Sequence, residues 1–151
     1  MDERELEVAR MTRTIWIIWG AFLTAGVLYL AVGYLITQGR RSAPLAEPEY
    51  LNDLRTIFYA LAGILLLGGF WLRRRLMNRA HSEPTAALIG AQAAMVVGWA
   101  LSETVAILGL ALVLLGGRWQ VGLPFIGLAF VAIVLQRPET ERLRSSIDAI
   151  H

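Results

Sequence analysis

The stretch AALIGAQAAMVVGWALSETVAILGLALVLL, residues 86–115, decides the fold, because apolar side chains dominate it and Glu103 is its only ionisable residue. A transmembrane helix needs about 20 consecutive, mainly apolar residues to cross roughly 30 Å of hydrocarbon. Residues 86–115 exceed that length. The sequence therefore predicts that they form one membrane-spanning helix.

Three more apolar blocks flank this stretch, and 56% of all residues are hydrophobic. The four blocks are Thr14–Ile36, Thr56–Leu72, Ala86–Leu115 and Trp119–Leu135. We therefore predict an all-α, polytopic membrane protein with four transmembrane helices in two hairpins. Its expected parts are a cytoplasmic N-terminal segment (1–13), a four-helix transmembrane domain (14–136) and a cytoplasmic C-terminal tail (137–151).

The fourth block contains Pro124, which we place early in its helix, with a kink as the alternative. A proline costs little in the first turn, because the N–H groups there have no intrahelical partner. If this block did not span, the C-terminus would lie on the other side of the membrane.

The positions of the arginines predict the topology. With four spans, both termini and the middle loop share one side. That side carries ten arginines, and the opposite side carries Arg40, Arg41, Arg55 and Arg118. The positive-inside rule then places both termini in the cytoplasm, and we expect the protein in the inner (plasma) membrane. The run Arg73–Arg75 follows the second block directly, so we interpret it as a topology anchor, with anionic lipid binding as the alternative.

The remaining composition bounds the function. The chain has no cysteine, which excludes disulfides and thiolate chemistry, and its formal charge of +2 is too small to indicate a nucleic-acid partner. Its two histidines, His81 and His151, lie outside the apolar blocks and have no second ligand at metal-site spacing. We expect no enzyme, no metal and no cofactor, and the expected partners are the lipid bilayer and other transmembrane helices.

A row of small residues runs along the third block when it is placed on a helix. Every fourth residue is small, which gives the set Ala86, Gly90, Ala94, Gly98, Ser102 and Ala106. In lipid, small residues let helix backbones approach closely, and this packing drives helix association. We predict that this row is a helix-packing surface, within a homo-oligomer or a larger membrane complex.

Glu103 is the only ionisable residue well inside any of the four blocks. A charge at such depth costs at least about 2.5 to 3.5 kcal/mol, and the residue usually faces the bundle interior or a polar path. Glu103 is therefore a candidate proton-binding residue, with Ser102 and Thr104 as its polar neighbours. The structural alternative is an interhelical hydrogen bond, which contributes only about 0.6 to 2 kcal/mol in membranes.

The same segment resembles the carboxylate-bearing helix of the rotor-ring c subunit of rotary ATP synthases. The resemblance is carried by Ser82-Glu83-Pro84 and by the run MVVGWALSETVAILGL, residues 95–110. It implies that Glu103 occupies the ion-carrying position and that Thr104 falls where sodium-type rings place a hydroxyl. Leu108 falls where many members have tyrosine, which favours protons over sodium.

Three functions stay open from the sequence. The first is a protein with a c-subunit-like hairpin that binds or passes protons at Glu103. The second is a structural or assembly subunit of a larger membrane complex. The third is a small proton-coupled transporter, in which Trp99, one turn before Glu103, would be an aromatic wall for a cationic substrate. Ordinary packing is the alternative reading of Trp99.

Overall fold

The computed structural model describes residues 3–39, 47–79, 84–116 and 118–138. These residues form four helices and no strand: α1 (Glu3–Gly39), α2 (Pro48–Arg79), α3 (Pro84–Gly116) and α4 (Trp119–Leu135). The predicted all-α class is confirmed for this part of the chain. Most of the predicted C-terminal tail lies outside the described residues, as do Ser82 and Glu83.

Prolines lie at the start of two helices and inside a third. Pro48 and Pro84 are the first residues of α2 and α3, where a missing N–H costs no hydrogen bond. α4 begins at Trp119, so Pro124 lies in the second turn of this helix. This position is early in the helix, as predicted, but it lies beyond the first turn, in which a proline costs no hydrogen bond. The carbonyl of Gln120 loses the helical N–H that residue 124 would otherwise donate.

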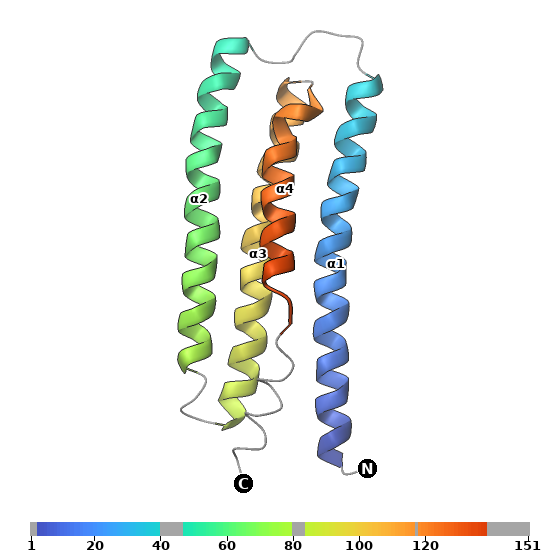
Figure 1. Ribbon diagram of the computed structural model, residues 1–151, viewed down its shortest axis with the longest axis vertical. Helices are drawn as coiled ribbons and strands as arrows, with labels where there is room; N and C mark the ends of the chain where they lie inside the picture. The colour runs from blue at the N-terminus through green and yellow to red at the C-terminus, as the bar shows by residue number, and fades with distance from the viewer. Residues whose placement is uncertain (1–2, 40–46, 80–83, 117, 139–151) are drawn as a thin grey trace.

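The four helices alternate in direction, and α3 lies at the centre of the bundle (Figure 1). α3 packs most extensively against α4 and also contacts α1 and α2. The α3–α4 pair separates α1 from α2, which lie on opposite sides of it (Figure 1). α3 and α4 thus form a packed hairpin, whereas α1 and α2 do not pack along each other as the predicted first hairpin.

Three of the helices are long and apolar enough to cross a membrane. The qualifying segments are Ala9–Gly39, Glu49–Leu76 and Gln92–Gly116. Large apolar side chains on α1 and α2 point outward; Ile64 and Leu67, for example, are 66% and 74% exposed. Such a continuous apolar exterior is typical of a membrane protein. α4 is a shorter apolar helix of 17 residues.

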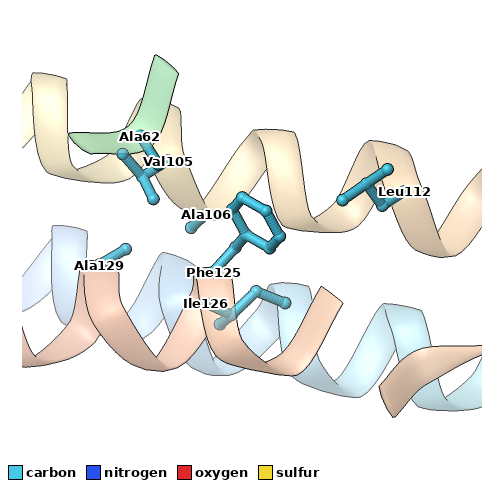
Figure 2. Packing of buried hydrophobic residues seen from close by; sticks show 7 residues of the cluster. All are labelled: Ala62, Val105, Ala106, Leu112, Phe125, Ile126 and Ala129. Atoms are coloured by element: carbon cyan, nitrogen blue, oxygen red, sulfur yellow. The ribbon is translucent and has the colours of Figure 1, made fainter. Parts of the chain in front are cut away.

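The core lies between α3 and its neighbours. Figure 2 shows Phe125 of α4 pointing toward α3 beside Ala106, and Ala62 of α2 beside Val105. The ring of Phe125 also stacks on Tyr59 of α2, with centroids 4.4 Å apart. A second cluster contains Ile15, Met95, Trp99 and Ile133 and joins α1 to the α3–α4 pair. Both clusters therefore depend on α3 and α4.

Two glycines set the distance between α3 and α4. A Cβ atom at Gly109 would lie 2.7 Å from Phe125 Cβ and 2.8 Å from the carbonyl oxygen of Gly122. A Cβ atom at Gly122 would collide with the carbonyl oxygen of Gly109 and lie 2.5 Å from Val113 Cγ2. Since backbone opposes backbone here, only glycine fits at either position. This close approach is the small-residue packing that membrane helices favour.

Candidate functional site

Glu103 lies on α3 where this helix faces α1. Its Oε1 accepts a hydrogen bond from the hydroxyl of Tyr29 on α1, with an oxygen–oxygen distance of 2.8 Å. Both side chains are half-buried. The carboxyl group is therefore placed at a helix interface, with a defined donor, at a depth where the surrounding side chains are apolar. Tyr29 was not predicted from the sequence.

The structure does not bring together the three residues predicted to bind a proton. Ser102 is buried, and its hydroxyl donates to the carbonyl of Gly98 while accepting from the side-chain amide of Gln136. Thr104 is exposed, and its hydroxyl donates to the carbonyl of Ala100 within the helix. Consecutive helical residues point about 100° apart, because one turn takes 3.6 residues. Glu103 has Tyr29 as its hydrogen-bond partner, and neither neighbour takes that role.

The row of small residues on α3 faces the inside of this single chain. Ala94, Gly98, Ser102 and Ala106 are buried. Gly90 is half-buried, and the side chain of Ala86 lies outside what the structure describes. A Cβ atom at Gly98 would meet the side chains of Gln136 and Arg73, and Ala106 packs against α4 in the core. The buried part of the row is thus covered by other residues of the same chain. The prediction had also considered that this row packs against another copy of the chain.

Two tryptophans hold the C-terminal end of α4. The indole N–H of Trp19 on α1 donates to the carbonyl of Ile133 over 3.0 Å. The indole N–H of Trp99 on α3 donates to the carbonyl of Gln136 over 2.9 Å. The last carbonyls of a helix lack intrahelical donors, so these bonds satisfy groups that would otherwise need water. Trp99 is 0% exposed, so its ring belongs to the core and offers no open face to a substrate.

Gln136 is a buried polar residue that sequence reasoning missed. It is 1% exposed, its amide nitrogen binds Ser102, and its Oε1 has no hydrogen-bond partner among the described residues. Arg73, at 7% exposure, approaches the same place: its Cδ lies 3.7 Å from the Cβ position at Gly98. The sequence offers one indication that Gln136 could be buried, which is that it directly follows the fourth apolar block. The polar residues Arg73, Ser102 and Gln136 thus lie close to Gly98, at a position that we call the polar level.

The described residues contain no group of three or more histidine, aspartate or glutamate side chains placed to hold a metal ion. No protein-family model, no curated protein and no solved structure matches the chain. The resemblance to the rotary c subunit therefore stays a prediction. Function has to be inferred from the geometry around Glu103.

Proposed function

We propose that the protein is a four-span membrane protein in which the carboxyl group of Glu103 binds and releases a proton. The observation that carries this proposal is the 2.8 Å hydrogen bond from Tyr29 to a half-buried carboxyl group within the bundle. Ionisable groups in membrane spans are costly and usually functional.

The proposed topology places the two termini and the α2–α3 connection in the cytoplasm. The alternation of the helices supports it, because the start of α1 and the ends of α2 and α4 point the same way (Figure 1). α4 has 17 residues, or about 26 Å at 1.5 Å per residue, which crosses a slightly thinned bilayer. Four spans would then cross the plasma membrane, with the arginine-rich side facing the cytoplasm.

The polar level at Gly98 supports proton exchange from the arginine-rich side. Arg73 and Gln136 approach Gly98, which lies five residues before Glu103 on α3. At 1.5 Å per residue this is about 7.5 Å along the helix axis. Along the helix axis, polar groups therefore lie within one and a half turns of the carboxyl group, on a different face of α3. This arrangement agrees with the proposed resemblance of α3 to the carboxylate-bearing helix of the c subunit. The proton-binding residue would then lie inside a single chain.

A structural function is the second candidate, because the same bond ties α1 to α3. In that case Glu103 would serve only as an acceptor for Tyr29, within a subunit that helps to assemble a larger membrane complex. Glutamine separates the two functions, because it keeps an acceptor oxygen for the Tyr29 hydroxyl but cannot exchange a proton in the same range. The transporter alternative has less support, since Trp99 is buried in the core.

Labelling with a hydrophobic carbodiimide tests the proposal. This reagent modifies protonated carboxyl groups inside membranes, so the full chain in a bilayer should be labelled at Glu103, as located by mass spectrometry of its peptides. Glu49 at the exposed start of α2 is an internal control, because water competes for the reagent there. A folded protein that is labelled at Glu49 but not at Glu103 would contradict proton binding.

Proton movement is tested with the Glu103→Gln variant in proteoliposomes that contain a pH-sensitive dye. We expect proton flux in the native protein and none above the lipid background in the variant. Thermal unfolding in detergent is the matched measurement, and both proteins should unfold at similar temperatures. Equal proton flux in the native protein and the variant would select the structural function. So would the absence of flux in both proteins, if their unfolding temperatures are equal.

A further inference from the structure

The arginine run at the end of α2 divides into an inward and an outward part. Arg73 is 7% exposed and approaches Gly98 of α3. Arg74 and Arg75 are exposed, and Trp71, one turn earlier, is 60% exposed. The outward pair therefore lies where the exposed apolar face of α2 ends. The role that we infer for Arg74 and Arg75 is separate from proton binding at Glu103 and does not depend on it.

The guanidinium group of Arg75 is held against the exposed indole. Its Cζ lies 5.0 Å from the centre of the Trp71 ring, within the range of a cation–π interaction. Side chains on a helix lean toward its N-terminus, which on α2 is toward the apolar face. Exposed indoles prefer the membrane–water interface. The cation is thus kept at the depth of the interface instead of extending into the loop water.

No carboxylate neutralises this pair within the part of the chain that the structure describes. Neither Arg74 nor Arg75 forms an ion pair there. Other exposed arginines lie toward the start of α1, at Arg10 and Arg13, and just after the end of α4, at Arg137. These two helix ends point the same way as the end of α2 (Figure 1). Arg74 and Arg75 therefore present positive charge at the border of an apolar surface, without a carboxylate partner among the described residues.

The opposite end of α2 provides a contrast within the same helix. Arg55 lies over the ring of Tyr59, with 5.8 Å from Cζ to the ring centre. Exposed carboxylates precede it on α2, at Glu49 and Asp53. The same arginine-over-aromatic arrangement is therefore present with acidic neighbours, where an anion would be repelled.

We infer that Arg74, Arg75 and Trp71 bind the phosphate group of an anionic phospholipid headgroup. The planar guanidinium fork matches phosphate oxygens in a bidentate way, and two such groups lie within one turn of α2. The exposed indole packs against the glycerol and upper acyl region, which a soluble phosphate lacks. The interfacial depth of Arg75 favours the lipid as the source of the phosphate.

Native mass spectrometry of the full chain tests this site. The protein in a neutral detergent is titrated with phosphatidylglycerol or with phosphatidylcholine, and the dissociation constant of the bound lipid is measured. Each basic residue near an anionic surface contributes about a fivefold gain in binding. We expect the double variant Arg74→Gln/Arg75→Gln to bind phosphatidylglycerol at least tenfold more weakly, and the control Arg55→Gln to bind it as the native protein does.

Three outcomes would overturn the inference: equal binding of the two lipids by the native protein, unchanged binding in the double variant, or equal loss in Arg55→Gln. Inorganic phosphate is added in a separate arm, and complete displacement of the lipid by it would assign the site to soluble phosphate instead. A second measurement needs no arginine variant. Brominated phosphatidylglycerol should quench the native protein more than Trp71→Phe, and equal quenching would count against the site.

Discussion

Replacing Gly122 with alanine should separate the α3–α4 hairpin. The added methyl group would collide with the carbonyl oxygen of Gly109 and lie 2.5 Å from Val113 Cγ2 and 3.0 Å from the Gly109 carbonyl carbon. Ordinary contacts of a Cβ atom start near 3.4 Å, so the helices must move apart by about 1 Å. Overpacking of this kind costs about 1 to 3 kcal/mol.

Gly127 on the same helix is a matched control, because a Cβ atom there meets nothing within 4 Å. Alanine is the better helix former by about 1 kcal/mol in water, so Gly127→Ala should be neutral or slightly stabilising. The free energy of unfolding is measured by circular dichroism during titration of mixed micelles with dodecyl sulfate. If Gly122→Ala were as stable as Gly127→Ala, the close approach of the two backbones would be refuted.

Three further predictions follow from contacts described above. Tyr29→Phe removes the hydrogen-bond donor to Glu103, so the free energy of unfolding should fall by about 0.6 to 1.7 kcal/mol. Carbodiimide should also label Glu103 faster in this variant, and unchanged labelling would argue against the bond. Trp99→Phe keeps an aromatic ring but removes the five-membered ring of the indole with its N–H, which leaves the Gln136 carbonyl without its donor. It should cost at least about 1 to 3 kcal/mol in dodecyl sulfate titration, and a loss below about 0.5 would mean that the bond is absent. Gly98→Ala makes its one close contact with the movable end of the Gln136 side chain, while Arg73 Cδ lies at an ordinary 3.7 Å. Its loss of stability should therefore be smaller than that of Gly122→Ala, and an equal loss would contradict this difference.

The sequence was sufficient to predict the helices but not their mutual rotation. Apolar length alone identified residues 86–115 as one helix, and α3 covers Pro84–Gly116. In contrast, the partner of Glu103 could not be predicted, because a helix that is apolar on all sides has no periodic pattern to show which face meets which neighbour. Tyr29 was nevertheless a hydroxyl donor inside the first apolar block, so it could have been considered as a partner.

The proton-binding role of Ser102 and Thr104 stays a prediction, but the hydroxyls of both donate to carbonyls of their own helix. Neighbouring residues on a helix face different directions, so adjacency to Glu103 in the sequence does not by itself bring these hydroxyls to its carboxyl group. The row of small residues was a better guide, since residues four apart share one face and four of its members are buried together. Gln136 gave no periodic indication, and its burial depends on where α4 ends against α3.

Among the described residues, α1 donates two side-chain hydrogen bonds to the rest of the bundle. The hydroxyl of Tyr29 reaches the carboxyl group on α3, and the indole of Trp19 reaches the end of α4. Any sideways shift of α1 would therefore strip a carboxylate and a carbonyl of their donors in the same movement. Because each stripped acceptor in apolar surroundings carries a desolvation penalty of about 1 to 3 kcal/mol, α1 should leave or rejoin the bundle as one cooperative unit, without gradual loosening.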